Sequence, residues 1–300
     1  MSEPPGGITL SSSTRNNLLS LQNTTQLIGR TQERLATGLK VNSAIDDALA
    51  FFKARNLNSR ANDLSTLKDS IANGISTIKA AVLGLETIED VLKQMKALTQ
   101  SAISSPESST RAKLASQFNE LRSQVDNIAE DAHFNGYNLL KNTSGAFQAG
   151  ADSLTVKFNE RVDNVTVNKL VVSGLKVADF SKILGQSAVA TGTAGTAGLW
   201  GQTGTKAILA INSAVRAIDS ALVTVRQAAQ NFGTNSAQLQ IRIEFTTNLI
   251  NTLRGGAAAL VNADLNEESA NLLSLQTRQE LGTTSLSIAQ SSEQSILRLF

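Results

Sequence analysis

The side chains that most often carry out chemistry are scarce in this 300-residue chain. There is no cysteine and one histidine, His133, so thiol chemistry, disulfides and Cys/His metal sites are excluded. His133 precedes an Asn-Gly pair, which favours a turn or surface position. The adjacent carboxylates Asp46-Asp47 and Glu267-Glu268 would point about 100° apart on a helix and would not converge on one reacting atom. We therefore predict no catalytic, cofactor-binding or metal-binding residues and no enzymatic activity.

The glycine-rich stretch and the overall charge do not indicate a nucleotide or nucleic-acid partner. Gly198 to Lys206 superficially resembles a phosphate-binding loop, but Lys206 is followed by Ala207 and no adjacent Gly-Lys-Ser/Thr occurs. Lys and Arg total 27 against 25 for Asp and Glu, a net charge of +2 that argues against a dedicated nucleic-acid binder.

The sequence lacks the usual features of membrane insertion and of signal-peptide secretion. No stretch of about 18 apolar residues occurs, so we expect no membrane-spanning segment. Residues 1–8 lack the basic and apolar regions of a cleavable signal peptide. We therefore expect a protein that is cytoplasmic or that leaves the cell by a route that does not read such a signal.

The spacing of apolar residues predicts long packed helices. Hydrophobic residues make up 41% of the chain and aromatic residues only 4%, so the core must be mainly aliphatic. Between Leu64 and Ala102 two offset sets of residues repeat every seven positions, which indicates a helix that packs against others. The two sets are Leu64, Ile71, Ile78, Leu85, Leu92 and Thr99, and Leu67, Gly74, Ala81, Ile88, Met95 and Ala102.

Two further stripes supply the partners of this helix. Pro106 must interrupt it, and the Ser and Thr residues nearby are positioned to cap a second helix with a stripe from Leu114 to Ile128. A third stripe, Ile208 to Leu253, must lie along the earlier helices to bury its apolar face. The predicted fold class is mainly α: long antiparallel helices packed as a coiled-coil-like bundle, with a small β-hairpin region in the middle of the chain.

The middle of the chain has a different character. Leu154–Phe158 and Val165–Val172 are rich in β-branched residues that roughly alternate, so they predict a β-hairpin. Ser187 to Thr205 is rich in Ala, Gly and Thr and contains Trp200, which indicates a loop or a mobile tip.

The two ends of the chain carry helical periodicity with little apolar surface. Their apolar residues are padded with small polar residues, too few to offset the entropy of ordering an isolated helix. We therefore predict that both ends are ordered only when something packs on them. The apolar residues concerned are Leu21, Ile28 and Leu35 at one end and Leu273, Leu281 and Ile288 at the other.

Motifs in these ends resemble those of bacterial flagellins. The segment Glu33-Arg34-Leu-Ala-Thr-Gly38-Leu-Lys-Val-Asn42-Ser-Ala-Ile-Asp46-Asp47 is similar to the family motif commonly written ERLSSGLRINSAKDDAAG. His133-Phe-Asn-Gly136 resembles the QFNG element of the family. At the other end, Asp264, Glu268 and Gly282 to Ser291 look like the DADYATE…QAGTSVLAQANQ ending. The matches run inward from both ends and leave out only about residues 176–205.

The resemblance implies a layered subunit of a helical polymer. Residues 1–50 and 262–300 would form terminal helices of the innermost filament layer, and 51–142 with 206–261 the long-helix bundle. Residues 143–175 would be the β-hairpin part of that bundle, and 176–205 a small, variable, surface-exposed segment. The chain would be a short-form flagellin that polymerises for swimming motility, its ends folding on assembly.

The resemblance also implies a location and partners. The chain would lie outside the cell in the flagellum, exported by the flagellar type III apparatus without a cleavable signal peptide. Its partners would be copies of itself, possibly sister flagellins, hook-associated and cap proteins, and a flagellar export chaperone, with no cofactor, nucleic acid or membrane. A chain without cysteine suits passage through such a channel in an unfolded state, because a disulfide would block threading.

Fourteen residues follow as an expected assembly interface, and three as positions of weakened recognition by the innate flagellin receptor. In recognised relatives the three positions carry Arg, Leu and Glu, whereas here they are Lys93, Ala97 and Gln117. The interface residues are Leu21, Ile28, Arg34, Leu35, Gly38, Asn42, Asp46, Asp47, Asp264, Glu268, Leu273, Leu281, Ile288 and Leu299.

Two other functions fit parts of the pattern. A hook–filament junction (hook-associated) protein has related ends and a similar length, although its motif tends to carry a PSDDP-like turn where this chain has Asn42-Ser-Ala-Ile-Asp-Asp-Ala48. A secreted coiled-coil adhesin or effector would make the terminal motifs a coincidence. Polymerisation of the purified protein, seen by electron microscopy, would separate a filament subunit from both.

Overall fold

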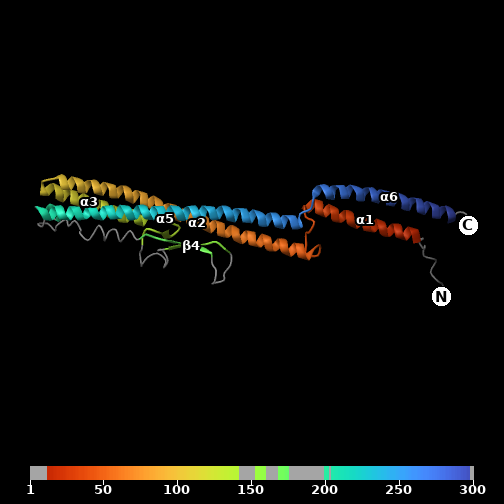
Figure 1. Ribbon diagram of the computed structural model, residues 1–300. Helices are drawn as coiled ribbons and strands as arrows, with labels where there is room; N and C mark the ends of the chain where they lie inside the picture. Colours follow the sequence, from red (N-terminus) through yellow and green to blue (C-terminus); the bar gives the residue numbers. More distant parts are fainter. Residues whose placement is uncertain (1–11, 142–152, 160–167, 176–198, 203, 298–300) are drawn as a thin grey trace, which may run out of the picture. The chain divides into compact units, whose positions relative to one another are not determined.

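The computed structural model describes residues 12–141, 153–159, 168–175, 199–202 and 204–297 (Figure 1). Long helices make up most of this part, and the predicted mainly α class is confirmed. The helices are α1 (Ser12–Thr37), α2 (Ala48–Ser104), α3 (Ser108–Asp131), α5 (Thr205–Val261) and α6 (Leu265–Leu297), with a short 3-10 turn, η1 (Leu199–Gly201). The strands are β1 (His133–Phe134), β2 (Tyr137–Asn138), β3 (Ser153–Lys157) and β4 (Lys169–Ser173).

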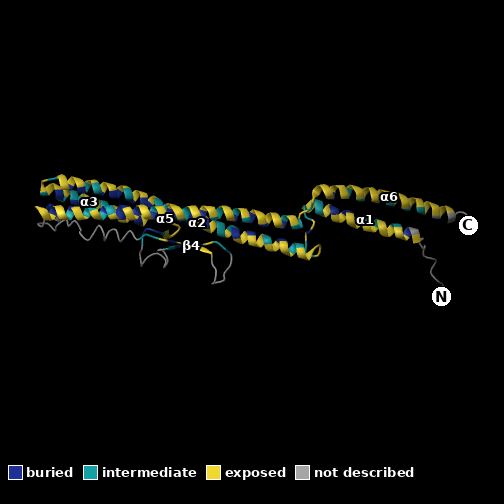
Figure 2. Cartoon of the chain, in the orientation of Figure 1, coloured by how far each residue is buried: buried dark blue, intermediate teal, exposed yellow. Residues whose placement is uncertain are grey.

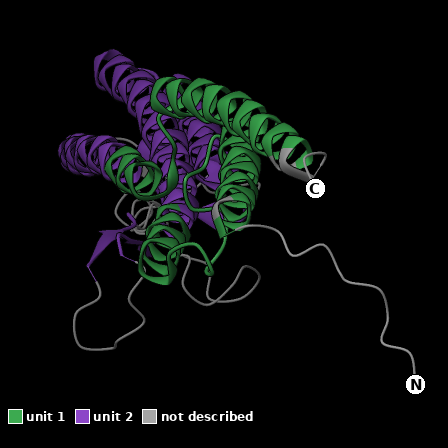
Figure 3. Cartoon of the chain, turned by 90° about the vertical axis from the view of Figure 1, so that its right-hand side faces the viewer, with its two compact units in different colours: residues 1–61, 251–300 green, residues 62–250 purple. Residues whose placement is uncertain are grey.

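The chain divides into two compact units, which Figure 3 colours separately. Unit 1 consists of residues 1–61 and 251–300, and unit 2 of residues 62–250. Unit 1 is therefore built from two stretches, one toward each end of the chain, and unit 2 from the single stretch between them. The four-layer division implied by the flagellin resemblance concerns the assembled polymer and stays a prediction.

Unit 2 is built around one aliphatic core. Its buried side chains come from α2, α3, α5 and the β3–β4 pair, and Figure 2 shows them as an inner stripe along the helices. The first heptad set of α2 is buried throughout, and all of the second set except Leu67 is buried. The stripe on α5 is confirmed at the set that begins with Ile211, whereas Ile208 of the other set is half exposed.

The turn between α2 and α3 forms at Pro106 as expected, but it is not held by Ser or Thr caps. Glu107 occupies the N-cap of α3 without a side-chain hydrogen bond. Instead the buried guanidinium of Arg111 donates to four main-chain carbonyls. These are Ser105 O (2.9 Å), Pro106 O (2.7 Å), Trp200 O (2.9 Å) and Gln202 O (2.8 Å). Through these four hydrogen bonds, Arg111 links the turn between α2 and α3 to the η1 segment.

Trp200 is the clearest correction to the sequence analysis. It was assigned to an exposed loop or tip, but its side chain is fully buried and packs on Phe118 with ring centroids 5.2 Å apart. Burial of a side chain of this size contributes more free energy than the loop loses in conformational entropy when it becomes ordered. Residues 176–198 and 203 of the predicted variable segment lie outside the described residues.

Two antiparallel strand pairs complete unit 2. β1 and β2 are joined by Asn135 (φ 50°) and Gly136 (φ 82°), a turn in which both residues need positive φ. The predicted hairpin is confirmed as β3 paired with β4, with Leu154 opposite Val172. This pair packs closely on α2, because a Cβ added at Gly74 would lie 2.8 Å from Val156 Cγ2.

Helix α5 is the one described helix that meets a length and composition test for crossing a membrane. An 18-residue window in it has a mean hydropathy of 1.5, although 28% of the window is buried in the protein. The sequence analysis expected no such helix. The buried side chains of α5, among them Ile211 and Ile218, belong to the core of unit 2, so packing accounts for the apolar character of that face.

Unit 1 contains the paired helices α1 and α6, which lie side by side (Figure 1). A small residue permits their close approach: a Cβ added at Gly282 would lie 2.8 Å from Leu21 Cδ2. Ile28 is buried, and Leu21 and Leu35 are half-buried. Most of the remaining surface of both helices is exposed (Figure 2).

Candidate functional site

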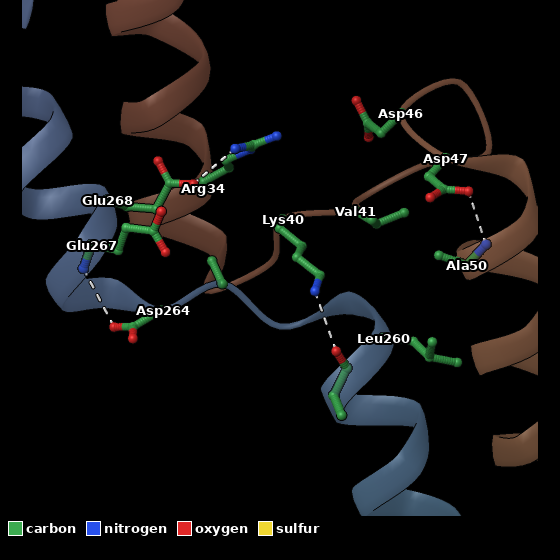
Figure 4. Close-up of a pocket in the computed structure, with 12 residues that line it drawn as sticks. Arg34, Lys40, Val41, Asp46, Asp47, Ala50, Leu260, Asp264, Glu267 and Glu268 are labelled. Atoms are coloured by element: carbon green, nitrogen blue, oxygen red, sulfur yellow. Dashed lines mark hydrogen bonds and ion pairs between the residues drawn. The ribbon is translucent and has the colours of Figure 1, made fainter.

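The motif residues of unit 1 gather where α1 ends, α2 begins and α5 passes into α6. We call residues 34–50 and 259–268 the terminal joint (Figure 4). They line a polar cavity of about 510 Å³. The joint is where this chain concentrates polar and charged side chains that contact one another, so it is the natural candidate for a functional site.

The chain leaves α1 through a glycine cap. Gly38 has a φ of 70° and its amide donates to Arg34 O at 2.8 Å, the arrangement that ends many helices and that residues with a Cβ rarely adopt. The following residues pair with the α5–α6 connection. Lys40 N donates to Val261 O (2.8 Å) and Ala263 N donates to Gly38 O (2.9 Å). Two short stretches far apart in sequence are therefore hydrogen-bonded to each other.

Two aspartates begin the helices that leave the joint. Asp47 Oδ1 accepts the Ala50 amide at 3.0 Å and so caps α2. Asp264 Oδ1 accepts the amides of Asn266 (2.9 Å) and Glu267 (3.4 Å) and so caps α6. The carboxylates of Glu267 and Glu268 in the first turn of α6 complement its positive N-terminal end.

A third aspartate holds the turn between α1 and α2. Asp46 Oδ2 accepts the amides of Asn42 (3.1 Å) and Ser43 (2.9 Å) and the Ser43 hydroxyl (3.1 Å), and Arg30 lies 3.7 Å from Asp46 Oδ1. The Ser43 amide and hydroxyl, followed by the Asn42 amide and the charge of Arg30, lower the pKa of Asp46 below its ordinary value of 3.8. The carboxylate form of Asp46 therefore locks the turn at neutral pH.

The ion pair between Arg34 and Glu268 links α1 to α6. Arg34 Nη1 donates to Glu268 Oε1 at 2.8 Å, and Glu268 is the one buried side chain among those described in α6. The partners are 234 residues apart in sequence. Because a buried carboxylate without its partner is costly, this pair fixes how α1 meets α6.

The structure thus divides the fourteen expected interface residues. Gly38, Asp47, Asp264 and the Arg34–Glu268 pair serve the chain's own joint, as do Asp46 and Asn42, whose side-chain amide donates to Glu33 Oε1 at 3.3 Å. The α1–α6 contact uses Ile28 and, over Gly282, Leu21, and Leu35 on α1 is half-buried. Leu299 lies outside the described residues. Three of the residues point away from the chain and are each about two-thirds exposed: Leu273, Leu281 and Ile288.

The sequence analysis missed several exposed apolar residues of unit 1. Ile45 in the turn before α2 and Leu49 and Phe52 in its first turns are 96%, 66% and 58% exposed. Their spacing of four and three residues is a signal in the sequence that could have found them.

The expected receptor positions and His133 all lie on the surface of unit 2. Lys93 Nζ is 3.2 Å from Glu89 Oε1 and 3.0 Å from Asp90 Oδ1, and these two carboxylates raise the pKa of Lys93, that of Asp90 first. Ala97 and Gln117 are exposed. His133 is exposed, with its Nδ1 3.2 Å from Glu130 O. In the described ranges no three His, Asp or Glu side chains come together as a metal site.

Comparison with known proteins gives the two ends of the chain a consistent match. Residues 8–145 match the bacterial flagellin N-terminal helical region, and residues 215–300 match the bacterial flagellin C-terminal helical region. Flagellin FljO of Caulobacter vibrioides is 34% identical over 94% of this chain and 95% of its own length. Flagellin C of Rhizobium meliloti is 30% identical over 90% of this chain and 91% of its own length.

A solved structure shares the fold. It is described as that of a putative flagellar hook-associated protein from Vibrio parahaemolyticus, and it superposes with a TM-score of 0.57 at 16% identity. The match covers 72% of this chain and 100% of the Vibrio chain. At that identity the likeness concerns the fold alone.

Proposed function

Because the chain belongs to the bacterial flagellin family and is a structural subunit of the exported, self-polymerising flagellar filament, we propose that unit 1 binds neighbouring subunits through the exposed face of α6. The observation that supports this is the exposure of Leu273, Leu281 and Ile288 in the single chain. They are spaced eight and seven residues apart, so they lie within an arc of about 80° and form one apolar line along one face of the helix. A helical polymer needs one face of a subunit to meet a different face of the next, and this line supplies an apolar one.

In this proposal the layers are those that the flagellin resemblance implies, and their boundaries lie eleven residues closer to the chain ends than those of the two units. Residues 1–50 and 262–300 form the innermost layer, and 51–142 with 206–261 form the bundle around it. Residues 143–175 carry the hairpin of that bundle, and 176–205 face outward. The fourteen interface residues then act in two ways: the joint residues shape unit 1, and the outward residues of α6, continued by Leu299, make the contacts between copies.

Folding of the ends is coupled to assembly. Exposed leucines on α6 gain little in a free monomer, and ordering a helix of this length costs conformational entropy that burial in a neighbour offsets. Such a chain can pass through a narrow export route without a cleavable signal peptide. Its further partners are the export chaperone, hook-associated and cap proteins, and sister flagellins that present the same faces.

Recognition by the innate flagellin receptor is weak in this proposal. At the three relevant positions Lys93 is held by its own carboxylate neighbours, and Ala97 and Gln117 offer a short apolar and a neutral polar side chain. A receptor-reporter assay on purified protein measures this directly. Activation equal to that of a strongly recognised flagellin would contradict it.

Removal of residues 281–300 tests the main proposal. We expect a monomer in which unit 2 melts as in the full chain but which does not extend added filament seeds, as seen by sedimentation and electron microscopy. A full-length variant in which Leu273, Leu281 and Ile288 are replaced by Ser should behave the same way. A matched variant in which Ser274, Ser285 and Ser292 are replaced by Ala leaves the apolar line intact and should polymerise. Normal filaments from the truncated chain would refute the proposal.

A further inference from the structure

The turn before α2 and the first turns of α2 carry exposed apolar side chains. Ile45 in the turn and Leu49 and Phe52 in the helix are all more than half exposed among the described residues. Ile45 extends from the turn that Asp46 holds, and Phe52 contacts Phe51, whose ring meets it edge-on with centroids 5.6 Å apart. We call these three residues the apolar knob. The joint holds the turn that carries Ile45, and the described part of the chain leaves most of the knob uncovered.

Unit 2 carries a groove between α2 and α5. Its volume is about 310 Å³, with Ile78, Val82 and Leu83 as the apolar residues on the α2 side. The α5 side is made of the small residues Gly233, Ser236 and Ala237 together with Gln240. Leu83 is 65% exposed, and a Cβ added at Gly233 would meet no atom within 4 Å. The groove is therefore open and has apolar side chains on its α2 side, flanked by polar ones.

The charges beside the knob and the groove are complementary. In the groove, Lys79 and Glu86 are exposed, are seven residues apart and form no ion pair with a described residue. Beside the knob, the acidic Asp46-Asp47 pair is followed by exposed Lys53 six residues after Asp47. At about 1.5 Å per residue both sets span roughly 10 Å. If the α2 segments of two copies lie parallel, the Asp46-Asp47 pair of one copy faces Lys79 of the other. Lys53 then faces Glu86, and the apolar residues lie between these two charge pairs.

From this match we propose that the apolar knob of one copy docks in the α2–α5 groove of unit 2 of another copy. The contact joins two different faces and leaves a free groove on one copy and a free knob on the other, so further copies can add head to tail, as an open filament requires. The inference rests on the proposed self-assembly and adds a second contact to that of α6.

Filling the groove is the first test. Gly233→Leu puts a bulky side chain where the chain itself has open space, so unit 2 should fold at least as stably. Polymerisation on seeds should nevertheless require at least a tenfold higher protein concentration. Gly233→Ala is the matched control and should polymerise like the parent chain. Equal critical concentrations for the Leu and Ala variants would overturn the inference.

A charge exchange tests the orientation. Glu86→Lys alone and Lys53→Glu alone should each raise the critical concentration several-fold at low salt, because like charges then meet. The double variant carries both exchanges in every copy and should recover most of the loss. The differences should shrink at about 1 M salt, where charges are screened within about 3 Å. A double variant worse than either single one would exclude this orientation.

A disulfide trap tests the contact itself, since the chain has no cysteine of its own. Filaments of the double variant Phe52→Cys with Ala237→Cys should, on oxidation, give a ladder of covalent multimers on a non-reducing gel. Phe52→Cys with Gln227→Cys, on another side of α5, should give none. If the parent chain forms filaments but the Phe52→Cys, Ala237→Cys variant gives no ladder, this inference is overturned and the α6 proposal is left intact. Failure of the parent chain to polymerise would instead remove the proposed self-assembly.

Discussion

Unit 1 and unit 2 are both built from long helices, but they differ in how far the apolar side chains of those helices are buried. In unit 2 the heptad seams of α2, α3 and α5 close on one another and on the β3–β4 pair, which leaves most of the leucines and isoleucines in these seams buried. In unit 1 the described side chains of α6 include one buried residue, Glu268, while Leu273, Leu281 and Ile288 are about two-thirds exposed. Unit 2 is thus stabilised by apolar burial, and unit 1 is defined by polar contacts at its joint.

This difference separates folding from assembly within one chain. Apolar burial contributes about 25 cal/mol per Å² wherever it occurs, within a chain or between copies. Unit 2 gains this energy alone, whereas the outward face of α6 gains it only from a neighbour. In the proposal, unit 2 therefore folds without a neighbour, whereas the ends of the chain are ordered only when they pack on one.

The largest expected difference between the units comes from Phe118→Ala in unit 2. Phe118 is fully buried against Trp200, and loss of a buried phenylalanine costs about 3–5 kcal/mol. Denaturant unfolding followed by circular dichroism should show a much lower midpoint for the bundle.

The counterpart is Leu281→Ala on the exposed face of α6. Its effect on monomer stability should stay within about 0.5 kcal/mol, because the side chain is mostly in water. Its effect on the critical concentration should instead be large. If both variants changed monomer stability equally, the contrast between the units would be wrong.

Two glycines sharpen the comparison within unit 2. A Cβ at Gly84 would lie 2.6 Å from Ala132 Cβ and 2.8 Å from Leu140 Cδ1, so Gly84→Ala should destabilise the bundle by about 1–3 kcal/mol. Gly233→Ala meets open space in the middle of α5 and should stabilise it by up to about 1 kcal/mol. Thermal unfolding of the two variants should move in opposite directions, and a shared direction would contradict the packing described at Gly84.

The features that the sequence predicts are those with local causes. The heptad sets on α2 and α5 recur every seven residues, so their buried faces can be read directly. Helix α2 begins 16 residues before Leu64, at Ala48, because Asp47 caps it there although the apolar repeat has not begun. Periodicity alone therefore locates a core face better than a helix end.

Features that depend on distant partners could not be read in this way. Trp200 follows a low-complexity stretch. It is buried because its ring packs on Phe118 and its main-chain carbonyl accepts a hydrogen bond from Arg111. The Arg34–Glu268 pair was expected as part of a motif, but its role as a bond between α1 and α6 depends on a contact across 234 residues. The resemblance to flagellin motifs points to the joint residues, and the structure shows which hydrogen bond or ion pair each of them forms.

The cap of α2 tests whether the joint is local. Asp47→Ala removes the acceptor for the Ala50 amide and should cost about 0.5–2 kcal/mol, expressed as fraying of the first turns of α2. Hydrogen exchange at Ala50 and Phe51 measures this. Asp69→Ala, at an exposed position inside the same helix, is the matched control and should leave these amides protected. Loss of the unit 2 core in the Asp47 variant would show that the joint is not a separate element.

Acid should loosen the joint before it affects the core of unit 2. The folded-state pKa of Asp46 lies below its ordinary value, so its carboxylate stabilises the turn above about pH 3.8, and this contribution is lost as the pH falls through the lowered pKa. The protection of the Asn42 and Ser43 amides, relative to their intrinsic exchange rates at each pH, should then fall, and the knob at Ile45 should lose its fixed position. Asp46→Asn removes the titrating group, so the protection of these amides should no longer change over that range. Because unit 2 buries aliphatic side chains, its circular dichroism should change little there, and a joint and a core that loosen at the same pH would argue against two independently stabilised units.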